Sequence, residues 1–142
     1  MPTRSGKATW TGTLKEGKGQ LESQSGAVKG AYSFPSRFED AGGTNPEELI
    51  AASHAGCYAM AFSALLGEEG YTAGQLDAEA KVTLEEVDGK PTISKIRLSV
   101  AGSADGIDEA TFKRVAEDAK GFCPVSRALA GTEISLETKF TG

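Results

Sequence analysis

Two cysteines, Cys57 and Cys123, are the side chains of this sequence best suited to covalent chemistry. A cysteine attacks as its thiolate, so the pKa of a reactive thiol has to fall from about 8.5 to about 7 or below. Cys123 directly precedes Pro124, which predicts that it is the N-cap of a short helix whose positive dipole end favours a thiolate. Ordinary roles remain open, because free cysteines are often buried as small hydrophobes and a cysteine before a proline can be a plain loop residue.

Arg37 and Glu47 could supply the charge that such a thiolate needs. A neighbouring guanidinium that lowers a thiol pKa by about two to three units stabilises the thiolate by about 3–4 kcal/mol. A carboxylate at a helix start could hold the guanidinium bidentately. Arg37 could instead be an ordinary solvated arginine in a loop. Glu47 could instead be an acid of the first helical turn that interacts favourably with the helix dipole.

His54 precedes Cys57 by three positions, so the two side chains can share a helix face as a base and a thiol or as metal ligands. A zinc-type site would need further ligands, and the sequence has no second histidine and no CxxC pair. We therefore expect no metal and no bound cofactor, and we interpret His54 as a packed or hydrogen-bonded helix residue.

The segment that must position Cys57 is a helix beginning at Asn45. Asn45 is a good N-cap, Pro46 suits the first helical position, and Glu48 falls where a capping-box acid reaches back. We expect this helix to end near Gly67 or Gly70. Its predicted inward stripe consists of Leu49, Ile50, Ser53, Cys57, Met60, Ala61 and Ala64.

Alternating and turn-forming residues predict the remaining elements. Strands are expected over 7–15 and 19–24, with a weaker one over 27–34 and a loop over 35–43 that carries Arg37. Asp88-Gly89 predicts a hairpin between strands over 76–84 and 95–100. Asp108 should cap a helix that is terminated by Gly121 and buries Phe112, Val115, Ala116 and Ala119. A short helix should follow from Pro124 to Gly131. The last expected element is a strand over 132–140, with Ile134, Leu136 and Phe140 inward. These elements predict an α+β fold with a largely antiparallel sheet.

Length and charge narrow the classes of protein. At 142 residues we expect one domain over residues 1–142. The net charge of −5 and the lack of a basic cluster argue against nucleic-acid and anionic-membrane partners. We expect no signal peptide and no run of about 18 or more apolar residues, hence a soluble, cytoplasmic protein. In a reducing cytosol a pair of cysteines would cycle rather than form a permanent disulfide.

Two motifs carry a resemblance to a known family. The segment Thr44-Asn45-Pro46-Glu47-Glu48-Leu49-Ile50, followed by His54-Ala55-Gly56-Cys57, and the segment Cys123-Pro124-Val125-Ser126 closely resemble the OsmC/Ohr family of osmotically inducible and organic hydroperoxide resistance proteins. The resemblance extends over essentially the full length. The residues of the first motif resemble the OsmC branch of this family rather than the Ohr branch.

The resemblance implies a thiol-dependent peroxidase that reduces organic hydroperoxides in stress defence. By resemblance, Cys57 is the peroxidatic cysteine, Cys123 the resolving cysteine with which it forms a disulfide, Arg37 the activating arginine and Glu47 the acid that organises it. The implied fold is an intertwined homodimer in which the sheet wraps around a central helix. An external dithiol, with a lipoyl-type dithiol protein as one candidate, would be the reductant.

Three further expectations stay open at this point. An apolar lining from Met60, Phe38 and Phe62 is our hypothesis for a preference for bulky organic hydroperoxides. A non-catalytic, stress-induced binding dimer would use neither cysteine. A thiol-disulfide oxidoreductase or redox sensor would use the same pair without turning over peroxide.

Overall fold

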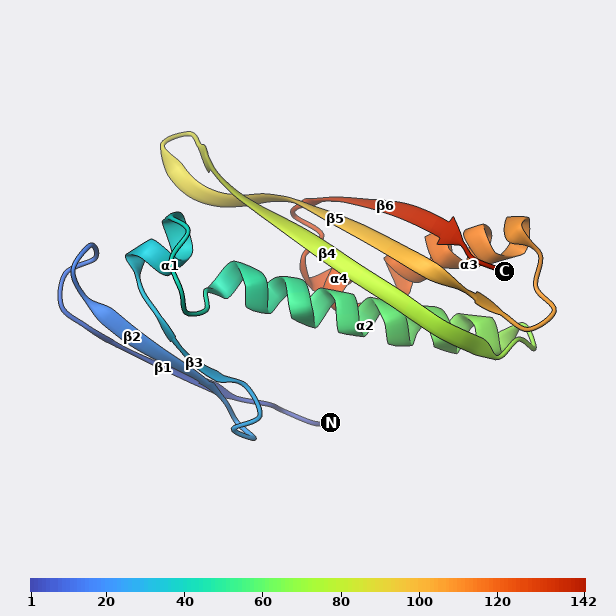
Figure 1. Cartoon of the computed structure of the whole chain (residues 1–142), viewed down its shortest axis with the longest axis horizontal. Coiled ribbons are helices and arrows are strands. Elements are labelled where there is room, and N and C mark those ends of the chain that lie inside the picture. Colours follow the sequence, from blue (N-terminus) through green and yellow to red (C-terminus); the bar gives the residue numbers. More distant parts are fainter. The chain divides into compact units, whose positions relative to one another are not determined.

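The computed structural model describes all residues from Met1 to Gly142 as two compact units, Met1–Leu49 and Ile50–Gly142 (Figure 1). The division falls inside helix α2, Pro46–Glu68, whose first turn belongs to the first unit and whose remaining turns belong to the second. The single domain over residues 1–142 therefore stays a prediction.

The first unit contains a three-stranded antiparallel sheet in the order β1 (Gly6–Thr11), β2 (Lys18–Ser23) and β3 (Lys29–Tyr32). The predicted hairpin and third strand are confirmed, although the first and third strands are shorter than expected. The half-buried character predicted for the first strand is wrong in this chain, because every residue of β1 is exposed. Alternation shows which side of a strand could be covered, but it does not supply the covering element.

A short helix, α1 (Phe34–Phe38), replaces the first part of the predicted loop and carries Arg37. Ser33 and Ser36 form a reciprocal capping box: the Ser36 N–H donates to Ser33 Oγ at 3.2 Å, and the Ser33 N–H donates to Ser36 Oγ at 2.8 Å. Such a box satisfies N–H groups that a helix start otherwise leaves unpaired. The loop prediction failed here because it relied on periodicity, which a single helical turn is too short to show.

Helix α2 begins as predicted. Asn45 Oδ1 accepts the backbone N–H of Glu48 at 2.8 Å, and the helix continues to Glu68. The Glu48 side chain does not complete a capping box with Asn45; it accepts instead from Thr44 Oγ1 at 2.8 Å. Glu48 is thus occupied at the helix start, as expected, but with a different partner.

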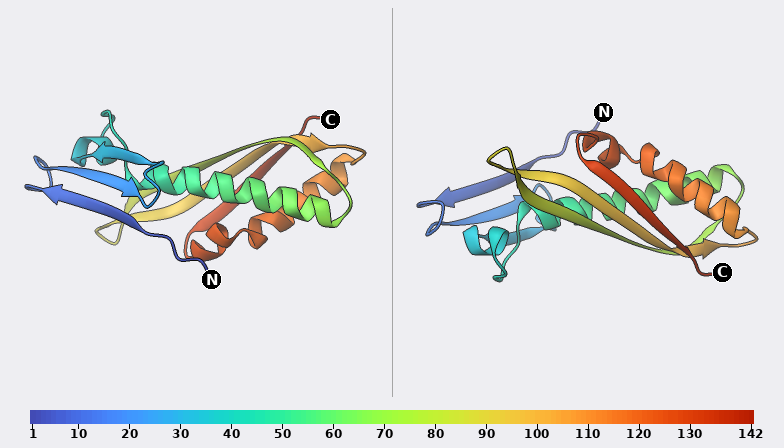
Figure 2. Two further views of the ribbon diagram at one scale, coloured as in Figure 1. Left: turned by 90° about the horizontal axis from the view of Figure 1, so that it is seen from below. Right: turned by 90° about the horizontal axis from the view of Figure 1, so that it is seen from above.

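The second unit is built on a sheet in the order β4 (Ala73–Val87), β5 (Lys90–Ala104) and β6 (Glu133–Phe140). Strands β4 and β5 form the predicted hairpin, and both turn residues, Asp88 and Gly89, have positive φ. Helices α3 (Glu109–Phe122) and α4 (Pro124–Ala128) return the chain so that β6 runs parallel to β5. Figure 2 shows helices α2 and α3 against one face of this sheet.

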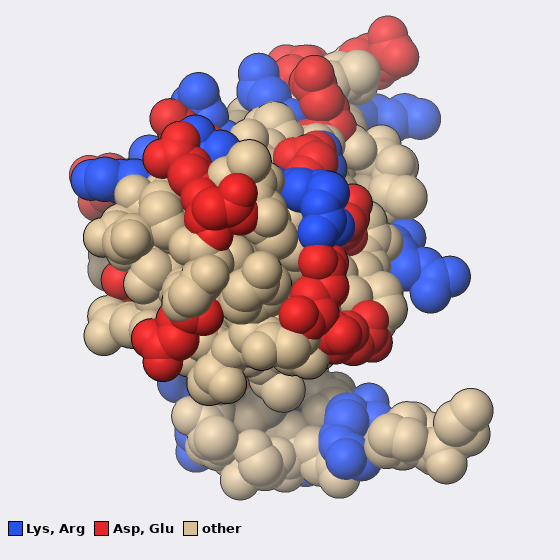
Figure 3. All heavy atoms as spheres, turned by 90° about the vertical axis from the view of Figure 1, so that its right-hand side faces the viewer, with Lys and Arg blue, Asp and Glu red and all other residues tan.

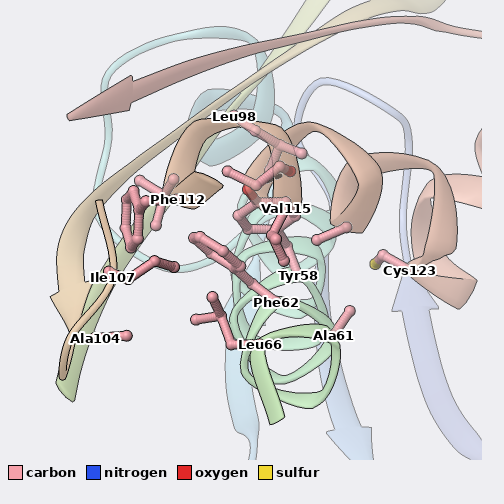
Figure 4. Close-up of a cluster of buried hydrophobic side chains, with 13 residues drawn as sticks. Tyr58, Ala61, Phe62, Leu66, Leu98, Ala104, Ile107, Phe112, Val115 and Cys123 are labelled. Atoms are coloured by element: carbon pink, nitrogen blue, oxygen red, sulfur yellow. Dashed lines mark hydrogen bonds between the residues drawn. The ribbon is translucent and has the colours of Figure 1, made fainter. Parts of the chain in front are cut away.

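The core of the second unit lies between these helices and the sheet (Figure 4). Phe62 of α2 meets Phe112 of α3 with ring centroids 4.9 Å apart, and Phe112 meets Phe140 of β6 at 5.3 Å. The predicted inward stripe of α3 is confirmed, since Phe112, Val115, Ala116 and Ala119 are all buried. That helix runs one residue past Gly121, to Phe122.

The inward stripe predicted for α2 is wrong in part: Ala61 is buried and Cys57 packs against the core, but three other members are exposed. Ser53 and Ala64 are exposed, and Met60 is 77% exposed. The buried face consists of the predicted Ala61 together with His54, Tyr58, Phe62 and Leu66, which were not predicted in the stripe. The helix itself carries small and apolar residues on all of its faces, so the periodicity of the sequence could not show which face packs against the core.

Helix α2 is also long and apolar enough by composition to cross a membrane, with a mean hydropathy of 1.5 over 18 residues. Its buried face belongs to the core of the second unit, so we assign it as the core helix of a small soluble α+β fold. On the face of the molecule in Figure 3, acidic and basic side chains are interspersed. Arg114, for example, contacts both Glu69 and Asp118.

Candidate active site

The two cysteines lie side by side in the second unit. Cys57 is in α2, Cys123 joins α3 to α4, and their Sγ atoms are 3.0 Å apart. Both are free thiols; Cys123 has no exposed surface and Cys57 is partly exposed. A disulfide bond is about 2.05 Å long, so the sulfurs need approach by only about 1 Å to form one. Cys123 lies at the edge of the apolar cluster in Figure 4.

Within the second unit, the surroundings of Cys57 favour its neutral thiol. Burial is the largest influence and raises the pKa of Cys57, and the hydrogen bond with Cys123 raises this pKa further. The backbone N–H of Val125 acts in the opposite direction and is outweighed. A cation is absent from these influences, so the second unit does not itself activate Cys57.

Cys123 is the N-cap of α4, as predicted from its place before Pro124. Burial acts to raise the pKa of Cys123, but the hydrogen bond with Cys57 and the backbone and hydroxyl groups of Ser126 outweigh it and lower this pKa. The Cys123 side chain makes no capping hydrogen bond with the start of α4. In this unit the negative charge of the thiol pair is therefore favoured on Cys123.

Arg37 and Glu47 form an ion pair in the first unit. Arg37 Nε and Nη2 both contact Glu47 Oε1, each at 2.9 Å. Glu47 Oε2 is buried without a partner, so the pair is not the two-oxygen fork expected from the sequence. Glu47 is 7% exposed, whereas the Arg37 side chain is 37% exposed. The carboxylate thus fixes one edge of the guanidinium and leaves other N–H groups free for an anion.

An aromatic cavity of about 220 Å³ lies beside Arg37 in the first unit. Its lining comprises Trp10, Leu14, Tyr32, Ser33, Phe34, Arg37 and Phe38. Phe38, one of the expected lining residues, is therefore at this cavity. Phe62 is not available as lining, because it has no exposed surface in the core of the second unit, and Met60 is an exposed residue of α2.

His54 is a buried, hydrogen-bonded helix residue, as interpreted from the sequence. Its Nε2 lies 2.7 Å from Ser126 Oγ on α4, and its Nδ1 has no hydrogen-bond partner. Burial lowers the pKa of His54 and keeps the imidazole neutral near pH 7. Sequence reasoning missed Ser126; the available signal was its position three residues after an N-cap. The chain contains no cluster of three or more His, Cys, Asp or Glu residues placed to hold a metal ion.

The four predicted site residues thus occur as two pairs, one in each unit. Arg37 contacts Glu47 in the first, and Cys57 contacts Cys123 in the second. Helix α2 carries a member of each pair, Glu47 in its first turn and Cys57 ten positions later.

Comparisons with known proteins identify relatives over almost the whole chain. The OsmC-like protein family model matches residues 39–139. Peroxiredoxin OsmC of Escherichia coli is 44% identical over 135 residues, which is 94% of each chain. Organic hydroperoxide resistance protein-like 1 of Staphylococcus saprophyticus is 29% identical, covering 92% of this chain and 91% of the relative.

Solved structures agree with this fold. The organic hydroperoxide resistance protein OhrB of Bacillus subtilis superposes with a TM-score of 0.70 at 23% identity, covering 96% of this chain and 98% of that one. An OsmC organic hydroperoxide resistance protein from Legionella pneumophila gives 0.71 at 21% identity, over 97% of both chains. The predicted α+β class is confirmed, and the chain belongs to the OsmC-like protein family.

Proposed function

We propose that the protein is a cysteine-based peroxidase that reduces organic hydroperoxides to alcohols, acting in the cytoplasm in defence against oxidative and osmotic stress. The observation that carries this proposal is the 3.0 Å contact between two free thiols, Cys57 and Cys123, drawn from different elements. The names of the relatives support a role in peroxide defence.

In the first step, the Cys57 thiolate attacks one oxygen of the hydroperoxide. An S–O bond forms, the O–O bond breaks, and the departing alkoxide takes up a proton to become the alcohol. The sulfur is oxidised to a sulfenic acid and the peroxide is reduced.

In the second step, Cys123 attacks the sulfur of the Cys57 sulfenic acid. The S–S bond forms, the S–O bond breaks, and the leaving hydroxide takes up the Cys123 proton and departs as water. The short separation of the two sulfurs favours this step over further oxidation of Cys57. An external dithiol, for which a lipoyl-type protein partner is the proposed carrier, then exchanges with the disulfide and restores both thiols without a bound cofactor.

Arg37 is the proposed source of the charge that activates Cys57. The surroundings within the second unit raise the pKa of Cys57, and a nearby cation would act against that rise. Arg37 has unused N–H donors and is fixed by the buried Glu47. We propose that Arg37, from the same subunit or from the partner of an intertwined homodimer, stabilises the thiolate and Glu47 orients it.

The cavity beside Arg37 supports an organic substrate. Its aromatic walls, from Trp10, Tyr32, Phe34 and Phe38, suit an alkyl or aryl group better than the two polar oxygens of hydrogen peroxide. We propose that the organic group of the substrate binds there.

Consumption of cumene hydroperoxide with excess dithiol tests this function. We expect turnover by the parent protein and none by Cys57→Ser, because the serine hydroxyl is not ionised near pH 7. Ser94→Ala, which removes a buried hydroxyl without a partner, is the control that should retain turnover. Equal consumption by the parent and Cys57→Ser would contradict the proposal and favour the non-catalytic binding dimer.

A thiol-disulfide oxidoreductase is the second candidate, because the same contact between the sulfurs suits a dithiol that exchanges with disulfides. The two functions separate when disulfide substrates and hydroperoxides are compared at equal concentration. Faster reduction of the hydroperoxide supports the peroxidase, and much faster reduction of the disulfide supports the oxidoreductase.

A further inference from the structure

His54 and Ser126 form a buried polar pair that the two-step chemistry above does not use. Both residues lie in the second unit, His54 on α2 and Ser126 on α4, and they join these helices through a 2.7 Å hydrogen bond. His54 has no exposed surface and Ser126 is 5% exposed. A buried polar pair in an otherwise apolar core costs stability unless it is fully satisfied, so its presence requires an explanation.

The unpartnered Nδ1 of His54 indicates which nitrogen carries the proton. A buried N–H without an acceptor is rarer in proteins than an acceptor with a free lone pair. The neutral ring is therefore best satisfied with the proton on Nε2, which then donates to Ser126 Oγ. In this arrangement the hydroxyl hydrogen of Ser126 is free to point elsewhere.

The Ser126 hydroxyl lies close enough to Cys123 to lower the pKa of its thiol. Ser126 is the third residue after Cys123, the position at which an N-cap side chain meets the helix start. The Cys123 sulfur lies 3.0 Å from Cys57 Sγ. Cys123 is therefore in contact with Cys57 and, as the N-cap of α4, is close in the chain to the Ser126 end of the His54–Ser126 pair.

We propose that His54 and Ser126 are positioning residues for the resolving step, forming a donor chain from His54 Nε2–H to Ser126 Oγ–H to Cys123 Sγ. The chain stabilises the Cys123 thiolate as it attacks the Cys57 sulfenic acid. No proton leaves His54 in this step, which stays neutral; the proton lost by Cys123 leaves in the water formed from the sulfenic hydroxyl. This role rests on the proposed peroxidase function for its kinetic consequence, but not for its effect on the thiol.

Other titratable groups also face Cys123. Cys57 is hydrogen-bonded to it, and Tyr58 on α2 lies close enough for a Cys123 thiolate to raise the Tyr58 pKa. Glu117 on α3 also raises the pKa of Tyr58. Tyr58 donates to the Ala116 carbonyl at 2.9 Å. Cys57 is therefore the one neighbour that ionises in the same range, and the test has to remove it.

The first arm of the test titrates Cys123 in a Cys57→Ala protein, by thiolate absorbance and by the pH dependence of iodoacetamide alkylation. Ser126→Ala should raise the pKa of Cys123 by about one pH unit, which leaves about tenfold less thiolate below that pKa. His54→Phe should raise it by less, because the serine hydroxyl remains. Ser126→Thr keeps the hydroxyl and should restore the parent value, and Ser94→Ala is the matched control for loss of a buried hydroxyl.

The second arm follows disulfide formation after one pulse of cumene hydroperoxide in proteins that contain both cysteines. Ser126→Ala should slow this step about tenfold at pH values below the pKa of Cys123, with the deficit closing as the pH rises. A Cys123 pKa that is the same in Ser126→Ala, Ser94→Ala and the parent would overturn the inference. Because the first arm needs no peroxide, absence of peroxidase turnover would count against the proposed function alone.

Discussion

At the scale of single residues, Glu47 is the most unusual carboxylate of the chain. One of its oxygens receives both N–H groups of Arg37, while the other is buried with no partner. An unpaired buried oxygen is costly, and such costs are retained where a group has work to do. Here that work is to hold Arg37 by one edge while its remaining donors stay open.

Replacing Arg37 by methionine tests its action on the thiol. In a Cys123→Ser background, Arg37→Met should raise the apparent pKa of Cys57 by about one to three pH units, because a nearby cation favours the thiolate. The pH dependence of alkylation of Cys57 provides the measurement.

Arg97→Met is the matched control, since Arg97 is an exposed arginine of β5. It should leave the Cys57 titration unchanged. If Arg37→Met and Arg97→Met give the same titration as the parent, Arg37 has no place in the site.

The residue scale also shows what sequence alone could reach. Cys123 could be recognised as an N-cap because Pro124 follows it, a local signal. The position of Ser126 after that N-cap was also a local signal, but its contact with His54 could not be recognised, because His54 is 72 residues away in the chain and only the packing of α2 against α4 joins them. Similarly, contact of Arg37 with Glu47 was foreseeable, but the sequence did not show that a single carboxylate oxygen would accept both N–H groups.

At the scale of elements, the sequence predicted where strands and capped helices occur. It did not always predict which face of a helix is buried. Asp88-Gly89, Asp108 and Asn45 carry strong local conformational signals, and each forms the predicted turn or cap. Helix α3 has a clear polar side, so its inward face was predicted correctly. Helix α2 lacks one, and the position of Cys57 relative to the core could be known only from the tertiary packing.

The tie between α2 and α4 gives the fold a defined pH dependence. The unfolded chain has a histidine pKa of about 6.5, whereas burial lowers the pKa of His54 in the folded state. Between these two values the unfolded chain binds a proton that the folded chain does not, so the free energy of unfolding should fall as the pH drops below about 6.5.

Urea unfolding at a series of pH values between neutrality and about 5 measures this effect. His54→Phe should flatten the dependence, and because His54 is the single histidine, no other imidazole contributes. Ser126→Ala keeps the imidazole and should keep the slope. Parallel pH profiles for the parent and His54→Phe would remove His54 as the cause.

At the scale of the whole molecule, the exposed apolar side chains favour an assembly larger than one chain. Met60 on α2 is 77% exposed and Phe122 at the end of α3 is 53% exposed. Helix α2 buries one face in its own core and leaves Ala, Gly and Ser residues on the others, a surface on which another helix can approach closely. This surface supports the proposed homodimer.

Sedimentation of a Met60→Glu protein tests the assembly. A buried carboxylate without a partner is strongly unfavourable in an apolar contact, so the variant should sediment as a monomer at concentrations where the parent is a dimer. Ala110→Glu, an equal change at an exposed position of α3, should remain dimeric. A Met60→Glu protein that is still a dimer would exclude this part of α2 from the interface.

The central claim is that one molecule of organic hydroperoxide converts the adjacent thiols into a disulfide through Cys57. The most direct test is intact-protein and peptide mass spectrometry after one equivalent of cumene hydroperoxide is added to the reduced protein. We predict a peptide cross-linked between Cys57 and Cys123, and in Cys123→Ser a sulfenic or sulfinic acid on Cys57 alone. Unmodified Cys57 with the peroxide unconsumed would contradict the account.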